Sequence, residues 1–183
     1  MLNRFFAVLL LVLLSPIFIL VGLFIFFEDG FPIFFTQKRV GINYTFFNIY
    51  KFRSMKKDTP NVATHLLENP KQYVLKVGRV LRKLSLDELP NLINIIKGDM
   101  VFVGPRPALY NQDDLMELRI KAGVETLIPG ITGWGQINGR DEISLEDKVK
   151  FEKEYLERKS IGFDLKIIIF TFTSVLKSDG VKH

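Results

Sequence analysis

The chain has 183 residues, which is room for one modest domain and excludes a multidomain assembly or a long repeat array. It has no cysteine, so disulfide bonds and thiolate metal sites are excluded, and its 48% hydrophobic content excludes a disordered chain. The net charge of +5 comes mainly from residues 30–86, which contain 11 basic and two acidic side chains. Such a basic section indicates an anionic partner: nucleic acid, a phosphorylated molecule or an acidic membrane surface.

The first predicted element is an uncharged apolar segment of 23 residues, from residue 5 to residue 27. It is long enough to cross a bilayer, and it is unlike a cleaved signal peptide because Glu28 and Asp29 follow bulky phenylalanines directly. Ser15 and Pro16 predict a break near its middle, because proline lacks the backbone donor and clashes with the preceding turn. Each half gives about 15 Å of helix, roughly half of a hydrocarbon core. Geometry alone allows a kinked spanning helix or a re-entrant hairpin in one leaflet.

Basic residues flank this segment on both sides. Arg4 precedes it, and six lysines and arginines lie between residues 38 and 57. Because basic residues gather on the cytoplasmic side of membranes, these flanks favour a hairpin with both ends on that side. The two acidic residues at positions 28 and 29 lie closest to the second end and weaken this argument.

The rest of the chain has no internal repeat and no glycine-serine linker. The β-branched and aromatic runs Ile33–Phe35 and Thr45–Phe52 predict strands. Apolar side chains at three- and four-residue spacing predict a basic amphipathic helix at 71–83, which either lies on anionic lipid or packs on the domain. The further predicted helices open near residue 85 or cover residues 111–122 and 144–159. The last apolar run, Ile161–Leu176, is too short and too polar to span a membrane, so it packs on the core or rests at the membrane interface.

The acidic pair Asp87-Glu88 lies where the helix near residue 85 is predicted to open. Its commoner explanation is structural, because Ser85 with Glu88 three residues later is a capping box. The alternative is chemical. If Asp87 is the N-cap, Pro90 falls in the first turn at little cost, and the carboxylate stays ionised beside amides that attract phosphate. Asp87 then suits a nucleophile or a Mg²⁺ ligand for a phosphorylated substrate.

Two loops are candidates for phosphate binding, each with a plain alternative. Within residues 98–107, two prolines hold Arg106 in a stiff extended loop, where its guanidinium either binds phosphate or is solvated at a surface turn. Residues 129–140 contain four glycines before Arg140, and they either allow close approach of a ligand or simply form turns. This loop matches neither a P-loop nor a dinucleotide fingerprint.

Lys51 and Arg53 project to one face if their run is extended, as a solvated basic strand also does. The two histidines, His65 and His183, are too few and too scattered for a histidine metal site. Any metal is therefore expected to bind through oxygen ligands.

Taken in their order along the chain, these blocks resemble the bacterial sugar transferase family, and more closely its small monotopic phosphoglycosyl transferases. The similarity covers nearly the whole chain, including the Ser15-Pro16 break. The blocks are specific together, although each alone is not. They are Phe35–Gly41, Lys51–Met55, Ser85–Pro90, Gly98–Pro107 and Pro129–Arg140.

The resemblance implies an α+β, mostly helical fold. Residues 1–29 are expected to form a re-entrant membrane helix broken at Ser15 and Pro16, and residues 30–183 a compact cytosolic catalytic domain with interfacial amphipathic helices. The expected location is the bacterial inner (cytoplasmic) membrane, with the catalytic domain on the cytosolic face.

The resemblance also implies the activity. A sugar-1-phosphate passes from a UDP-sugar to polyprenol (undecaprenyl) phosphate, giving a polyprenyl-diphosphate sugar and UMP, with Mg²⁺ required. The sugar implied is an N-acetylated hexose or a diacetamido sugar. Asp87 matches the nucleophile, which forms a covalent phosphosugar intermediate and is also assigned to the metal, and Glu88 matches its partner acid. The cations assigned to the substrate are Lys51, Arg53, Arg106 and Arg140.

The expected partners are the UDP-sugar donor, the polyprenol phosphate acceptor, membrane lipid and downstream glycosyltransferases, without nucleic acid. Two other functions compete with the transferase. One is a membrane-anchored hydrolase that cleaves nucleotide-sugars with the same carboxylates and Mg²⁺. The other is a non-catalytic, membrane-bound module that binds acidic lipid or nucleic acid through residues 30–86.

Overall fold

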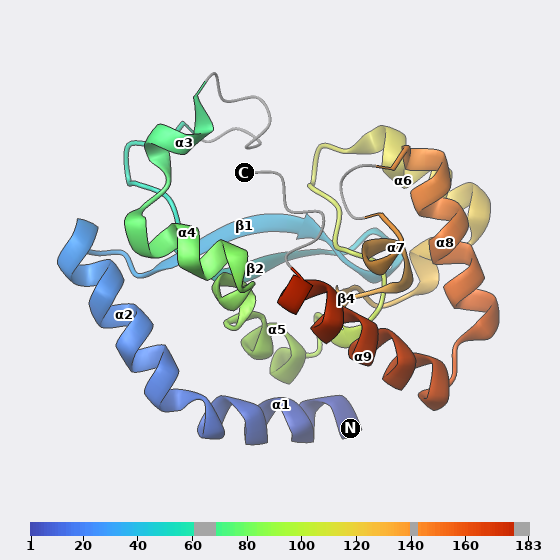
Figure 1. Ribbon diagram of the computed structural model, residues 1–183. Helices are drawn as coiled ribbons and strands as arrows, with labels where there is room; N and C mark the ends of the chain where they lie inside the picture. Colours follow the sequence, from blue (N-terminus) through green and yellow to red (C-terminus); the bar gives the residue numbers. More distant parts are fainter. Residues whose placement is uncertain (61–68, 140–142, 178–183) are drawn as a thin grey trace.

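The computed structural model describes residues 1–60, 69–139 and 143–177, and these residues form an α+β fold in which helices predominate (Figure 1). At the centre lie an antiparallel pair, β1 (Phe34–Val40) with β2 (Phe46–Phe52), and a short parallel pair, β3 (Val101–Val103) with β4 (Gly130–Thr132). The helices around them are α1 (Leu2–Leu13), α2 (Ser15–Asp29), α3 (Pro70–Tyr73), α4 (Lys76–Lys83), α5 (Asn91–Lys97), α6 (Asp113–Ala122), α7 (Trp134–Ile137), α8 (Leu145–Arg158) and α9 (Ile161–Lys177), with 3-10 turns η1 (Ile42–Tyr44), η3 (Leu86–Glu88) and η4 (Val124–Thr126).

The strand predictions are confirmed in position, but β1 is longer than predicted. Its register runs from Phe34 opposite Phe52 to Val40 opposite Phe46. The apolar pattern ends at Phe35, whereas the strand continues through polar residues because their backbone groups pair with β2. At the turn between the strands, Asn43 has a left-handed φ of 48°, which asparagine tolerates better than most residues.

The single helix predicted for residues 71–83 is wrong. Val74 forms an antiparallel bridge with Met55, and the Leu75 amide donates to the Ser54 carbonyl at 3.0 Å, so the segment divides into α3 and α4. Gly78 lets α4 approach this backbone, because a Cβ there would lie 2.1 Å from the Ser54 carbonyl oxygen. Pairing with a distant segment therefore overrides the local helical pattern.

The N-terminal segment breaks where the sequence predicts. α1 and α2 meet at 61°, with Pro16 in the first turn of α2. The Ser15 hydroxyl donates to the Val12 carbonyl at 2.8 Å, which is the acceptor that a donor at position 16 would otherwise use. In the described residues neither helix alone has the length and apolar composition to cross a bilayer, whereas the bent pair taken together does.

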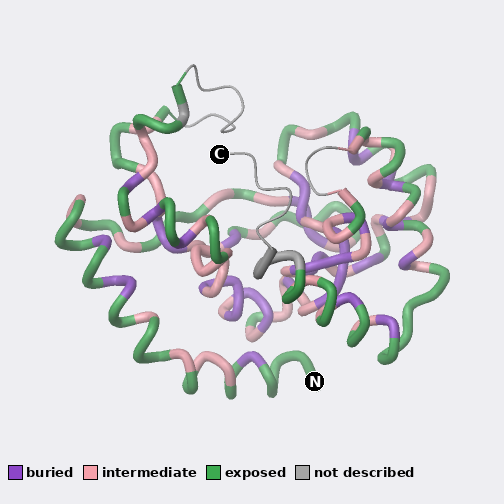
Figure 2. The backbone as a smooth tube through the Cα atoms, in the orientation of Figure 1, coloured by how far each residue is buried: buried purple, intermediate pink, exposed green. Residues whose placement is uncertain are grey.

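One side of this hairpin packs on the rest of the protein and the other side is open. α1 contacts α5 and α2 contacts α4, with Ala7 and Ile25 fully buried between them. The outer side is exposed and apolar, as the green stretches of α1 and α2 in Figure 2 show. The exposed large side chains there include Phe5, Leu9, Val12, Leu13, Ile19, Leu20, Leu23, Phe24 and Phe27.

The first end of the hairpin is hydrogen-bonded to the rest of the protein. The Arg4 guanidinium donates to the Lys97 carbonyl at 3.2 Å, where it meets the unsatisfied C-terminus of α5. The Asn3 side-chain oxygen accepts from the Phe102 amide at 3.4 Å. The beginning of α1 therefore lies against the end of α5 and β3.

The second end of the hairpin is tied to the same body. The Glu28 carboxylate accepts from the amides of Lys76 at 2.5 Å and Val77 at 3.0 Å, and so caps the N-terminus of α4 from another helix. Asp29 forms an ion pair with Arg53. The two acidic residues that opposed the hairpin on charge grounds are thus paired within the protein.

The C-terminal helix α9 takes the first of its two predicted placements. It packs on β3 and β4, and Phe163 and Ile167 are buried in a core shared with α6 and α8. Its other side is exposed and apolar, with Ile161, Leu165 and Ile169 open. The helix is therefore part of the core and also presents an apolar face outward.

Candidate active site

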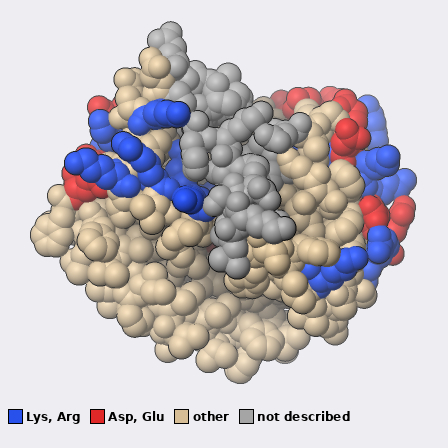
Figure 3. Space-filling view, viewed as in Figure 1, with Lys and Arg blue, Asp and Glu red and all other residues tan. Residues whose placement is uncertain are grey.

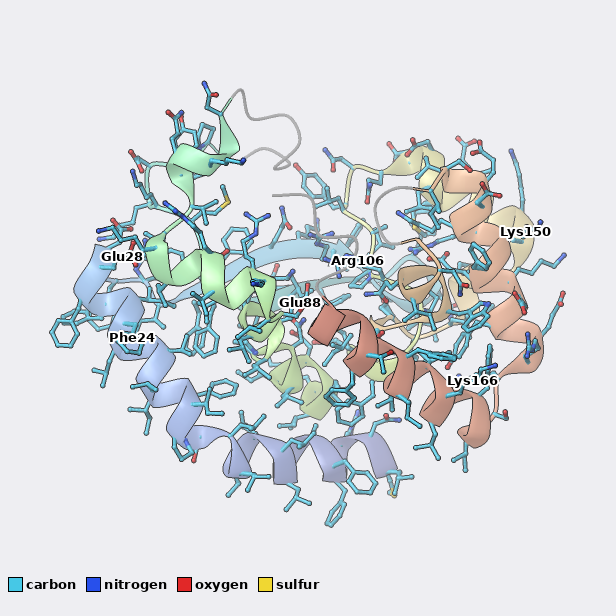
Figure 4. All side chains as sticks on the ribbon, in the orientation of Figure 1. Phe24, Glu28, Glu88, Arg106, Lys150 and Lys166 are labelled. Atoms are coloured by element: carbon cyan, nitrogen blue, oxygen red, sulfur yellow. The ribbon has the colours of Figure 1, made fainter. Side chains whose placement is uncertain are left out.

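Three predicted site residues meet at the centre of the protein. The Lys51 ammonium lies 2.6 Å from Glu88 Oε1, and the Arg106 guanidinium lies 3.1 Å from the same oxygen. Lys51 comes from β2, Glu88 from η3 and Arg106 from the loop after β3, and Figure 4 shows Glu88 and Arg106 next to each other. Arg106 is 18 positions from Glu88 in the sequence, and Lys51 is 37 positions from it, so only the fold brings the three residues together.

The backbone around the acidic pair contradicts the capping box. Ser85 adopts a left-handed conformation with φ 55°, and no side chain caps the 3-10 turn that follows it. α5 begins only at Asn91, after Pro90, so neither Ser85 nor Asp87 is the N-cap of a long helix. Neither carboxylate therefore caps a long helix, and Glu88 instead meets the side chains of Lys51 and Arg106.

An open pocket of about 240 Å³ lies beside this cluster. Cationic side chains dominate its polar lining, so it is suited to an anionic ligand. The lining residues are Arg39, Ile49, Lys51, Glu88, Asn91, Met100, Arg106, Pro107, Gly130 and Ile131.

The two carboxyl groups differ in their electrostatic surroundings. Burial raises the pKa of Asp87 to about 6, since nearby Lys51 offsets only part of the desolvation and Glu88 adds repulsion. Burial also acts on Glu88, but Lys51 and Arg106 outweigh it and hold the pKa of Glu88 well below its ordinary value. Glu88 is therefore a permanently ionised partner of two cations. Asp87 has no hydrogen bond or ion pair among the described residues and changes its charge near neutral pH.

The structure places Arg53, one of the predicted substrate contacts, away from the pocket. Arg53 does not line the pocket; its guanidinium is buried and donates to the carbonyls of Pro32 and Gly30 and to the Asp29 carboxylate. β2 ends at Phe52, so the alternation that would have placed Arg53 beside Lys51 stops one residue too early. We assign Arg53 to holding the end of the hairpin. Arg140 and His65 lie outside the described residues.

Arg39 lines the pocket and was missed by the sequence analysis. Its guanidinium donates to the Pro107 carbonyl at 3.1 Å and to the Gln37 side chain at 2.6 Å. Burial and the neighbouring Arg106 lower its pKa to about 10, so two like charges lie close together here. Arg39 lies opposite Phe47 and therefore shares a sheet face with Lys51. Its place in the basic section of residues 30–86 was the signal that the sequence offered.

The site has oxygen ligands that suit a divalent cation. No cluster of three or more histidine, cysteine or acidic side chains lies close enough to hold a metal within the described ranges. Asn91 lines the pocket together with Glu88, and its Oδ1 is a buried acceptor without a hydrogen-bond partner among the described residues. Mg²⁺ takes oxygen ligands and is often held by one or two carboxylates together with substrate phosphates. Asp87 and Asn91 fit this mode of binding.

Charge on the surface is unevenly arranged. In Figure 3 basic side chains gather over α3 and α4, and the lower part of the view, over α1 and the adjoining end of α2, has almost no acidic or basic side chain. The basic residues of α3 and α4 are Lys71, Lys76, Arg79, Arg82 and Lys83.

The amino-acid sequence is similar to those of proteins in one family. The sequence profile described as bacterial sugar transferase matches residues 1–178. The chain is 42% identical to an uncharacterized sugar transferase, EpsL, of Bacillus subtilis, over 84% of this chain and 75% of that protein.

Two further relatives are longer and have named activities. The UDP-glucose:undecaprenyl-phosphate glucose-1-phosphate transferase of Escherichia coli is 38% identical over 90% of this chain and 37% of its own length. The undecaprenyl-phosphate galactose phosphotransferase of Salmonella typhimurium is 34% identical over 95% of this chain and 39% of its own length. This chain therefore matches little more than a third of each of these two relatives.

Proposed function

The chain belongs to the bacterial sugar transferase family, and from this we propose that it transfers a sugar-1-phosphate from a UDP-sugar to undecaprenyl phosphate. The products are an undecaprenyl-diphosphate sugar and UMP. The observation that carries this proposal is the match of residues 1–178 to the family, with the Asp87-Glu88 pair beside a pocket lined by cations. Glycosyltransferases that extend the lipid-linked product would act downstream.

We propose that the reaction has two steps. The ionised Asp87 carboxylate forms a bond to the phosphorus that bears the sugar, and the bond from that phosphorus to the UMP oxygen breaks. A phosphate oxygen of the lipid then attacks the same phosphorus, and Asp87 leaves as a carboxylate. Arg106 and Lys51 offset the negative charge on the phosphoryl oxygens, while Glu88 holds these two cations beside the reacting group.

We further propose a requirement for Mg²⁺, which would be held by Asp87 and Asn91 together with donor phosphate oxygens. Support comes from Asn91, which lines the pocket and whose buried Oδ1 has no hydrogen-bond partner among the described residues. When bound, the ion neutralises charge on the diphosphate and the departing UMP. Because the phosphates of the substrate supply some of its ligands, such an ion does not need three acidic or histidine side chains from the protein.

The proposed location is the cytoplasmic membrane, with α1 and α2 dipping into its cytosolic leaflet as a re-entrant hairpin. Two facts support it. The exposed side of the hairpin is apolar, and both its ends are hydrogen-bonded to the same body, at Arg4 and at Glu28. Contacts of both ends with one body support a placement in which the two ends lie on the same side of the bilayer. The lipid acceptor stays in the membrane, so this anchor would keep Asp87 near the headgroups.

The test is UMP release by the membrane-bound protein with a panel of UDP-sugars, in the presence and absence of undecaprenyl phosphate. The panel includes glucose, galactose, N-acetylated hexoses and a diacetamido sugar, because the named relatives differ in their sugar. We expect one donor to give a lipid-linked sugar together with UMP in more than enzyme-equivalent amounts, and only when the lipid is present. Continued turnover without the lipid would identify a nucleotide-sugar hydrolase instead.

The pKa of Asp87 makes a prediction for pH dependence. Because the pKa of Asp87 is raised to about 6, its carboxyl group is protonated below that pH and cannot attack phosphorus. We expect kcat/KM for UMP release to fall about tenfold per pH unit below pH 6 and to be level above it. Replacing Lys51 with methionine removes a cation that lowers the pKa of Asp87, so the acidic limb should move to higher pH. An acidic limb that stays in place in the Lys51→Met variant would contradict this assignment.

A further inference from the structure

The segment Pro105-Arg106-Pro107 presents Arg106 to Glu88, yet it belongs to neither a helix nor a strand. Two of its three residues are prolines without a backbone N–H, so the segment has only one amide that could fix it. It is instead held by its carbonyls, each of which accepts a hydrogen bond from a different element. The Pro105 carbonyl accepts from the Gly130 amide at 2.9 Å, the Arg106 carbonyl from Arg119 Nη2 at 2.8 Å and the Pro107 carbonyl from Arg39 Nη1 at 3.1 Å.

Of these three donors, Arg119 is the one that does not belong to the pocket. It lies on α6 and is buried, with 4% of its surface exposed. Glu152 on α8 is equally buried and binds it through two contacts, from Nε at 2.8 Å and from Nη2 at 2.5 Å. Arg119 therefore joins α8 to the backbone of Arg106.

Stability alone gives little reason for this buried pair. Removing two charges from water costs free energy that their attraction often fails to offset, and apolar residues of similar size are frequently at least as stable. The pair supplies something that an apolar pair cannot, which is a donor at the Arg106 carbonyl, held in place by the fork of contacts with Glu152.

We propose that Arg119, fixed by Glu152, is a positioning residue for the transfer reaction. It holds the backbone of Arg106 so that the Arg106 guanidinium stays beside Glu88 and the reacting phosphoryl group. This inference rests on the proposed function. Arg119 and Glu152 lie on α6 and α8, and Arg119 reaches the site through the backbone carbonyl of Arg106.

The first experiment replaces both members of the pair, as Arg119→Leu with Glu152→Leu, so that no single buried charge is left behind. We expect a folded protein whose Tm is equal to or above that of the wild type. We expect kcat for UMP release to fall roughly 10- to 100-fold, because small displacements of a charge-stabilising group are costly, while KM for the donor changes much less. An unchanged kcat in this double variant would overturn the inference.

A second experiment separates positioning from general loosening of the fold. In an Arg106→Ala background the double leucine variant should cause no further loss, because its effect passes through Arg106. The control is Val149→Ala, another buried residue of α8, which should lower the Tm, leave kcat unchanged and act independently of Arg106→Ala. A loss from the double leucine variant that multiplies with that of Arg106→Ala contradicts positioning.

The two proposals fail in different ways. A wild-type protein that releases no UMP with any donor contradicts the proposed function. An active wild type, an impaired Arg106→Ala variant and an unimpaired double leucine variant contradict only the positioning role of Arg119.

Discussion

Replacing Asp87 with asparagine is expected to abolish UMP release, with a loss of roughly 10³-fold or more, because an amide cannot act as the nucleophile. The change keeps the size of the side chain and removes only its charge. Labelled donor should leave a phosphosugar on the wild-type protein when the lipid is withheld, and no label on the Asp87→Asn variant. The measurements are UMP release and the mass of the protein after the donor is added.

The matched control is Asp113→Asn, which removes the same charge from the exposed first turn of α6. It should retain wild-type activity. Asp87→Asn should still bind membranes, since Asp87 lies outside α1 and α2. If Asp87→Asn lost membrane binding along with activity, misfolding would explain the result, and Asp87→Ala with a Tm measurement would then decide. Labelled phosphosugar found on Asp87→Asn would refute the nucleophile.

The second prediction is a large difference in thiol labelling between the two sides of the membrane. The chain has no cysteine, so Asn3→Cys and Lys150→Cys each introduce a single thiol, at exposed positions on α1 and α8. In intact spheroplasts a membrane-impermeant thiol reagent should label neither variant, and in inside-out vesicles it should label both. The reason is that the start of α1 is bonded through Arg4 to the end of α5, on the same body as α8.

Permeabilised membranes provide the control for this experiment, because both thiols should then react whatever their side. Labelling of Asn3→Cys in spheroplasts together with labelling of Lys150→Cys only in inside-out vesicles would show a spanning helix. That outcome would overturn the re-entrant hairpin while leaving the proposed chemistry at Asp87 untouched.

Features that depend on neighbouring residues could be predicted from the sequence. The break at Ser15 and Pro16 is one, because it follows from the missing donor of proline and the nearby hydroxyl. The helices α6 and α8 are others, and each lies within about two residues of its predicted bounds. The order of the motifs also singled out Lys51, Glu88 and Arg106, whose side chains lie together in the structure.

Features that depend on distant partners could not be predicted. The bridge from Val74 to Met55 divides a pattern that is continuous in the sequence. Arg39 and Arg53 are both basic residues of extended segments, yet the first faces the pocket and the second holds the end of the hairpin. Their roles depend on which carbonyls and carboxylates the fold brings near them.

By itself, then, the sequence determined the broken apolar segment, most of the helices and the set of residue types available for phosphate chemistry. The tertiary structure alone decided which of 25 lysines and arginines surround the acidic pair and how deeply each carboxyl group is buried. The physical reason is the distance along the chain over which each kind of interaction acts. Helical periodicity and proline chemistry act over a few residues, whereas burial and charge pairing depend on groups that are remote along the chain and adjacent in space.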